Sequence, residues 1–228
     1  MQPNPYADDR TRPLVSSIRV DPSTPVATHQ SHFLGPHTDT CWRQTLTGLL
    51  LMHCLEAHPQ GGRSLLVDGF KVAERLRREV PEAFELLASV PIDFAALVSD
   101  DDQWRVQGRV ISLSSDGLVE GIRYNGNSID QLECRDELVE PMYQALESFE
   151  RILYDQQLWW QPRLAPGDML VMDNHRILHG REAFDPAMGL RHLQCCNVER
   201  DDFHNRYRRL ARRQGNEGWN RRLSAGVF

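Results

Sequence analysis

The apolar segments of this sequence are short, and their length limits the fold more than any other feature does. A typical one covers residues 49–52, whereas a helix that crosses a membrane needs ~20 consecutive apolar residues. Short apolar runs between turn-forming residues are typical of β-strands. The sequence therefore predicts a fold made mainly of strands, and we expect no membrane partner.

The first half of the chain predicts two strands followed by two helices. Apolar runs at residues 46–52 and 64–67 have the length of strands. Val72 and Leu76 then stand four residues apart, and Pro81 is followed by a second apolar cluster, as expected for proline at the first position of a helix. We therefore expect two short helices directly after the second strand.

The second half predicts a hairpin, a long helix and further strands. Asp116-Gly117 lies between two strand-like runs, which is a strong hairpin signal. Apolar residues recur on one helical face between residues 142 and 153. The strand-like segments of this half are 109–113, 118–124, 169–172 and 192–198.

This order of segments favours a single domain without internal repeats. We expect a mainly β fold with inserted helices (α+β), either a β-sandwich or a jelly roll. Residues 1–30 are rich in proline and charge and predict an extended N-terminal arm. Residues 31–213 then form the predicted domain, and residues 214–228 form a C-terminal tail.

Charge and cysteine content restrict the partners. The formal net charge of −6 argues against nucleic acid, because phosphate binding requires an excess of cations. Residues 205–213 predict an amphipathic basic helix, which we interpret as a solvated surface or a subunit contact, compatible with a homodimer. The five cysteines lack CxxC spacing and predict reduced thiols. Without a secretion signal at the N-terminus, we expect a cytoplasmic protein.

His37-Thr38-Asp39 is the pattern that points most clearly to chemistry. In an extended segment, residues i and i+2 project from the same face, so His37 and Asp39 can reach one metal ion. A lone His-x-Asp is common by chance, and its alternative is a surface histidine. His179 and Arg191, far along the chain, add a second imidazole and a guanidinium.

Two imidazoles and one carboxylate are the ligands of non-haem Fe(II) oxygenases, because they leave coordination positions open for other ligands. If 2-oxoglutarate is the co-substrate, its distal carboxylate needs a fixed cation. The planar guanidinium of arginine can donate two parallel hydrogen bonds to a carboxylate, which the ammonium group of lysine cannot do. Arg191 meets that requirement.

The sequence resembles the γ-butyrobetaine and trimethyllysine dioxygenase branch of the taurine-dioxygenase-like superfamily. The resemblance rests on motifs in family order: His37-Thr38-Asp39-Thr40, residues 51–55, 61–70 and 84–87, Asp173-Asn174-His175-Arg176-Ile177-Leu178-His179-Gly180-Arg181, and Arg191-His192-Leu193. It implies a distorted double-stranded β-helix with Fe(II) held by His37, Asp39 and His179. It also implies that Arg191 and Ser64 hold 2-oxoglutarate.

Three departures from this family concern the substrate and the flanks of the site. Asn197 stands where betaine hydroxylases place an aromatic ring around the trimethylammonium group, although Trp42 and Tyr124 could supply rings. Asn125 lies near a position that contacts the substrate carboxylate in relatives. His175 replaces the usual tryptophan and is expected to be a buried packing residue or a group that supports a metal ligand. Relatives carry an N-terminal domain, and only thirty-six residues precede His37 here.

The resemblance implies an Fe(II)- and 2-oxoglutarate-dependent dioxygenase that uses O2 to hydroxylate an unactivated C–H bond of a small substrate. Amino-acid-like or betaine-like molecules fit this description. One alternative is a non-catalytic jelly-roll relative that binds a small molecule or a partner chain. Another is a cupin-like zinc or iron isomerase, which the position of Arg191 disfavours.

Overall fold

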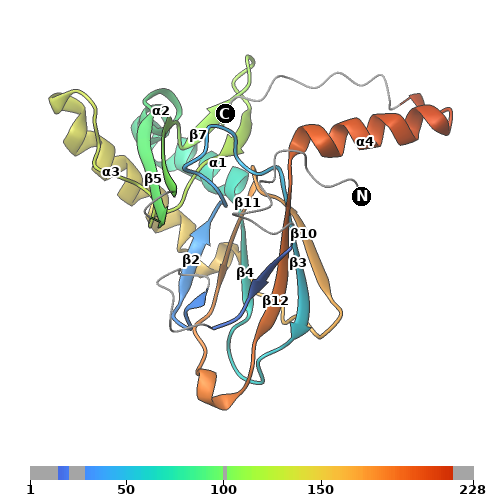
Figure 1. The fold of residues 1–228 in the computed structure, drawn as a ribbon. Coiled ribbons are helices and arrows are strands. Elements are labelled where there is room, and N and C mark those ends of the chain that lie inside the picture. The colour runs from blue at the N-terminus through green and yellow to red at the C-terminus, as the bar shows by residue number, and fades with distance from the viewer. Residues whose placement is uncertain (1–14, 21–28, 100–101, 218–228) are drawn as a thin grey trace.

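Two four-stranded antiparallel sheets form the centre of the molecule (Figure 1). The computed structural model describes residues 15–20, 29–99 and 102–217. The first sheet has the order β1 (Ser16–Ile18), β12 (His192–Val198), β3 (Leu49–Glu56), β10 (Met169–Asp173). The second sheet has the order β2 (Leu34–His37), β11 (Ile177–Arg181), β4 (Ser64–Asp68), β9 (Trp159–Trp160).

Successive strands alternate between the two sheets. The chain changes from one sheet to the other at each step from β1 to β4, and it does so again at each step from β9 to β12. The predicted strands in these regions are confirmed. The predicted N-terminal arm contributes a strand, because β1 pairs with β12 through Ser16–Ile18.

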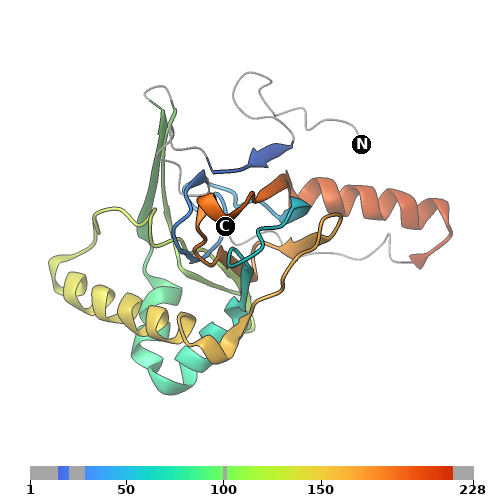
Figure 2. The same cartoon turned by 90° about the horizontal axis from the view of Figure 1, so that it is seen from below.

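The inserted helices and two hairpins lie between β4 and β9 in the sequence. In Figure 2 the helices of this insertion gather on one side of the sheets. The helices are α1 (Gly69–Glu79), α2 (Pro81–Ser89) and α3 (Asp136–Leu153). The hairpins are β5 (Ile92–Ser99) with β6 (Asp102–Gly108), and β7 (Ile111–Leu113) with β8 (Val119–Ile122).

Local sequence explains where these elements begin. Asp68 ends β4 and caps α1, since its side chain accepts a hydrogen bond of 3.1 Å from the Phe70 N–H. Pro81 opens α2, as predicted. Asp136 begins α3 six residues before the predicted apolar face, because acidic residues stabilise the positive end of a helix. The Asp116-Gly117 hairpin is also confirmed.

Two apolar clusters hold these layers together. The larger one packs α1, α2 and α3 against the second sheet, and it includes Phe84, Phe94 and Phe149. The smaller one lies between the two sheets and consists of Leu50, Met52, Cys54, Leu66, Met172 and Leu193. All five cysteines are free, as predicted.

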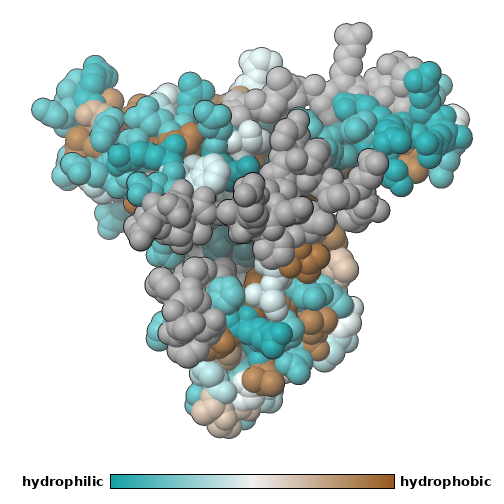
Figure 3. Space-filling view, viewed as in Figure 1, coloured by the Kyte–Doolittle hydropathy of each residue, from teal (hydrophilic) through white to brown (hydrophobic). Residues whose placement is uncertain are grey.

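Helix α4 (Arg200–Arg213) follows β12 and projects away from the sheets (Figure 1). It contains the predicted basic helix. The surface over α4 is mainly hydrophilic in Figure 3. Within the described part of the chain, no helix is long and apolar enough to cross a membrane.

Candidate metal centre

Two neighbouring strands bring the predicted metal ligands together. His37 is the last residue of β2 and pairs in register with His179 of β11, and their ring centroids are 4.3 Å apart. Asp39 follows two residues after His37. Its Oδ1 lies 3.6 Å from His37 Nε2 and 3.7 Å from His179 Nε2. The three donor atoms all lie within 4.8 Å of one another.

A glycine permits the close approach of these two strands. Gly180 follows His179, and a Cβ atom added to it would lie 2.4 Å from the backbone oxygen of Leu34 on β2. Any side chain at this position would therefore push β2 away from β11. The two imidazoles lie side by side across the two strands, with their ring planes tilted by 43°.

A hydrogen bond of the His37 ring to the backbone orients its Nε2 atom toward Asp39. His37 Nδ1 lies 2.9 Å from the carbonyl oxygen of Gly35, which can only accept, so Nδ1 carries the proton. The Nε2 atom then lies on the side of Asp39. Such a backbone partner fixes the tautomer of a metal-ligating histidine.

His179 is neutral at physiological pH. Burial, and then the charge of His37, lower its pKa to about 4. Its Nδ1 is buried without a hydrogen-bond partner among the residues that the structure describes. A neutral imidazole and an adjacent carboxylate are suitable donors for a divalent transition metal, so the residues fit such an ion.

A pocket between the two sheets reaches the candidate metal centre. Its charged and polar lining comes from Asp39, His179, Arg181 and Arg191. Its apolar wall is formed by strand residues that face the interior, and they are Ile18, Leu34, Leu50, Met52 and Cys195. The pocket therefore combines two of the candidate metal ligands, two arginines and an apolar wall.

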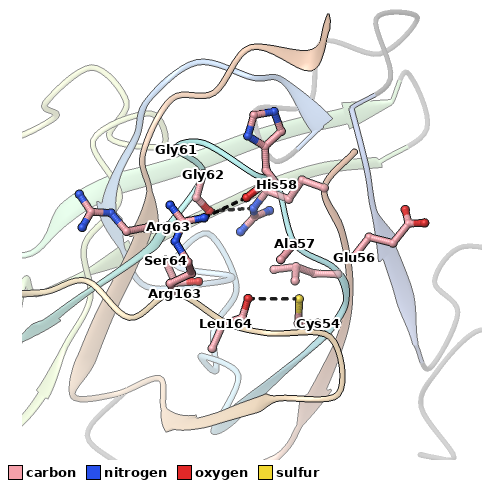
Figure 4. A pocket seen from close by; sticks show the side chains of 12 residues that line it. Cys54, Glu56, Ala57, His58, Gly61, Gly62, Arg63, Ser64, Arg163 and Leu164 are labelled. Carbon is pink, nitrogen blue, oxygen red and sulfur yellow. Dashed lines mark hydrogen bonds between the residues drawn. The ribbon is translucent and has the colours of Figure 1, made fainter. Parts of the chain in front are cut away.

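Arg191 and Ser64 both line a second pocket. Figure 4 shows this pocket with Ser64 among its labelled residues. Arg191 is only 8% exposed, and its Nε donates a hydrogen bond of 3.0 Å to the Gly62 carbonyl. Burial, and then the like charge of Arg181, lower the pKa of Arg191 to about 10. The guanidinium is therefore still charged at neutral pH.

Arg181 was missed by the sequence reasoning. It lies two residues after His179, on the same face of β11, and this spacing could have indicated it. The side chain is buried, and its Nη2 donates to the carbonyls of Gln30 at 2.6 Å and His32 at 2.8 Å. Arg181 thus fastens the segment that leads into β2.

The predicted substrate residues are dispersed. Tyr124 is 1% exposed and donates to Glu150, so its ring belongs to the core, which corrects the expectation that it faces a substrate. The Asn125 side chain accepts from the Asn127 N–H at 3.0 Å within a turn. Trp42 packs against the larger apolar cluster. Asn197 is exposed on β12.

His175 is buried, as expected for a packing residue. Its Nε2 lies 3.4 Å from the Leu46 carbonyl oxygen. Burial, followed by the charge of Arg200, lowers the pKa of His175 to about 4. The side chain therefore packs as a neutral imidazole.

The fold and the site together define a class of protein. Two antiparallel sheets pack together, and two imidazoles and one carboxylate converge at one place to form a candidate 2-His-1-carboxylate metal centre. The chain belongs to the family described as Taurine catabolism dioxygenase TauD, TfdA, whose profile matches residues 1–197.

Curated relatives are similar over most of this chain. It is 37% identical over 167 residues to the gamma-butyrobetaine dioxygenase of Pseudomonas sp. (strain AK-1), covering 73% of this chain and 43% of that protein. It is 36% identical over 184 residues to the mitochondrial trimethyllysine dioxygenase of Gallus gallus, covering 78% and 43%. The chain thus spans less than half the length of these relatives.

Solved structures share the fold at low sequence identity. An asparagine oxygenase solved with Fe(II), 2S,3S-3-hydroxyasparagine and succinate has a TM-score of 0.64 at 20% identity, covering 82% of this chain and 56% of that one. The non-heme iron oxygenase OrfP, solved with Fe and alpha-ketoglutaric acid, has a TM-score of 0.60 at 18% identity, covering 82% and 56%.

Proposed function

We propose that this chain is an Fe(II)- and 2-oxoglutarate-dependent dioxygenase that hydroxylates a C–H bond of a small amino-acid-like or betaine-like substrate. The observation that carries the proposal is the convergence of His37, Asp39 and His179 at the edge of a pocket that also contains Arg191. The curated relatives named above, which are dioxygenases, support it.

The side chains have distinct roles in this proposal. His37, Asp39 and His179 would hold the iron from one side, which leaves its other side open to the pocket. The Arg191 guanidinium would pair with the distal carboxylate of 2-oxoglutarate, and the Ser64 hydroxyl would donate to the same group. Bound iron, 2-oxoglutarate and O2 would supply the oxidising power that amino-acid side chains lack.

The pocket wall would keep water away from the reacting atoms. Leu34, Leu50 and Met52 line it with apolar surface, and their exclusion of water strengthens the charge interactions of Arg191. Trp42, Asn125 and Asn197 stay our candidates for substrate contacts. Asn197 lies two residues after the pocket residue Cys195 on β12, so the two residues share a face of the strand, which supports a polar group at the mouth of the pocket.

We also infer that the two sheets form a double-stranded β-helix, or jelly roll. The alternation of successive strands between the sheets on both sides of the insertion supports this assignment. The proposed domain of residues 31–213 then also includes β1, which pairs with β12. A homodimer and a cytoplasmic location are further parts of the proposal.

The proposed function is tested by anaerobic titration of the purified chain with Fe(II) and 2-oxoglutarate. We expect a visible metal-to-ligand charge-transfer band that requires both additions and is lost in His179→Ala. Absence of the band in the folded wild-type chain would contradict the proposal.

Formation of succinate from 2-oxoglutarate under air distinguishes an enzyme from a non-catalytic relative, even when no substrate is known. We expect succinate only when iron is present. A chain that gives the charge-transfer band and forms no succinate would be a binding protein.

A further inference from the structure

The buried amide of Asn174 pairs with both backbone groups of the carboxylate ligand. Its Oδ1 accepts a hydrogen bond of 2.8 Å from the Asp39 N–H, and its Nδ2 donates one of 3.1 Å to the Asp39 carbonyl. Nδ2 also donates to the Thr47 carbonyl at 2.9 Å. Asn174 is 0% exposed, and its amide therefore satisfies its hydrogen bonds entirely inside the protein.

Asn174 is itself fixed in the turn that joins β10 to β11. Its backbone N–H donates to the Gly48 carbonyl at 2.9 Å, and the Arg176 N–H closes the turn on the Asp173 carbonyl at 3.1 Å. The same turn leads directly into β11, which carries His179. The side chain thus connects the segment of one metal ligand to the hairpin of another.

The backbone next to Asp39 needs such support. Thr40 has a φ of +58°, in the left-handed region that residues with a Cβ rarely adopt. Its Oγ1 accepts from the Thr47 N–H at 2.9 Å and lies 3.1 Å from Thr47 Oγ1. Asn174 therefore holds the residue before the strained position, while Thr47 holds the strained residue itself.

We propose that Asn174 is a positioning residue that sets the direction of the Asp39 carboxylate toward His37 and His179. The inference rests on the proposed metal centre and goes beyond it, since Asn174 is not itself one of the three donors. Rotation of the residue 39 peptide would turn the carboxylate away from the two imidazoles, whose Nε2 atoms lie 3.6 and 3.7 Å from Asp39 Oδ1.

The test compares binding of Co(II) to the wild-type chain, to Asn174→Ala and to a destabilised control under anaerobic conditions. The control is Leu87→Ala, which removes a fully buried side chain of α2 in the larger apolar cluster, away from the candidate metal centre. Circular dichroism measures the folded fraction, and Co(II) d–d absorption reports the arrangement of the ligands.

We expect Asn174→Ala to raise the Kd for Co(II) about 10- to 100-fold and to change the d–d spectrum, as found when partners of metal ligands are removed. Leu87→Ala should lower the Tm and leave both the Kd and the spectrum unchanged. If Asn174→Ala does not fold, Asn174→Ser is measured in the same way, because its hydroxyl keeps a polar group in the cavity.

A folded Asn174 variant with the wild-type Kd and spectrum would overturn the positioning role, even if its Tm were lower. That result would leave the proposed function intact. Absence of Co(II) binding by the folded wild-type chain would instead overturn both the metal centre and the inference that depends on it.

Discussion

At the scale of single residues, the candidate site depends on charges that are kept out of water. Arg191 and Arg181 are both buried beside the same pocket, and burial lowers the pKa of each to about 10. A charged guanidinium in such surroundings is stabilised by an anion, which favours a dianionic co-substrate. The neutral imidazole of His179 completes this arrangement, because a protonated one could not bind a metal ion.

Replacement of Arg191 by lysine tests the role of the planar guanidinium. Lysine keeps the charge and loses both the two-pronged pairing with a carboxylate and the hydrogen bond to Gly62. We expect the Kd for 2-oxoglutarate to rise about 10- to 100-fold. Calorimetric titration in the presence of Mn(II) measures it.

Arg63→Lys is the matched control, since Arg63 lines the second pocket and pairs with Glu182 at 2.7 Å. It should bind 2-oxoglutarate as the wild-type chain does. Equal affinities of Arg191→Lys and Arg63→Lys would count against the proposed carboxylate pairing.

Neutral His175 makes the metal-free protein sensitive to acid. Its pKa is 6.5 ordinarily and about 4 in the folded state, so the unfolded state binds the proton more readily. The free energy of unfolding should therefore be highest above pH 6.5 and fall as the pH drops toward 4, by up to about 3 kcal/mol from this residue.

Urea titrations at several pH values measure this loss. His179 has a lowered pKa and contributes in the same direction, so His175→Gln should flatten part of the slope. An identical pH dependence in His175→Gln and the wild-type chain would contradict the prediction.

The sequence indicated His37 and Asp39 as candidate metal ligands because their spacing defines a shared face without any knowledge of the fold. Asn174 could not be recognised in the same way. Its role arises from a turn that brings residue 174 next to residue 39. Asparagine side chains in turns commonly form hydrogen bonds to nearby backbone groups, so the residue type alone does not indicate a distant partner. Tyr124 was misplaced for the converse reason, because spacing alone does not show whether a ring lies in the core.

At the scale of elements, the helices were predicted well and one hairpin was missed. The apolar faces of α1 and α3 and the proline at α2 are local signals, and they placed those helices. The β5–β6 hairpin has no glycine-rich turn signal in its sequence. It is held partly by tertiary contacts, such as the backbone hydrogen bond from Ala95 to Ser128 at 2.8 Å, which no local pattern reveals.

The junction between β4 and α1 allows a test of helix capping. Asp68 caps the helix and pairs with Arg176 at 2.6 Å. We expect Asp68→Ala to lower the free energy of unfolding by about 1–2 kcal/mol, because the cap and the ion pair are both lost. Guanidinium denaturation followed by circular dichroism measures this change.

Asp68→Asn separates the two contributions, since asparagine keeps the cap and removes the charge. It should lose no more than about 1 kcal/mol, in line with the small value of exposed ion pairs. A loss as large as that of Asp68→Ala would show that capping contributes little here.

At the scale of the whole molecule, α4 stands apart from the sheets and carries an exposed apolar stripe. Phe203, Tyr207 and Leu210 recur at helical spacing, and basic residues such as Arg206 border them. The solvent face of α3 is acidic, with exposed Glu140 and Glu147 around Tyr143. These two faces are complementary in charge, which supports a homodimer in which α4 of one copy meets α3 of the other.

Sedimentation equilibrium tests this arrangement. We expect the wild-type chain to be dimeric and the double variant Phe203→Glu, Leu210→Glu to be monomeric with an unchanged helical signal, because charge on the stripe prevents burial. Arg213→Glu alone should weaken the dimer less. A monomeric wild-type chain at micromolar concentrations would rule the arrangement out.

The contact between β2 and β11 also limits how this protein can diverge. Because a Cβ at position 180 would meet the backbone of β2, even alanine there would displace the strand that carries His37. In a saturation library selected for metal binding, Gly180 would therefore tolerate as little change as the ligands themselves, although it donates nothing to an ion. Efforts to transplant the site onto another scaffold would have to copy the glycine at position 180 together with the three donors.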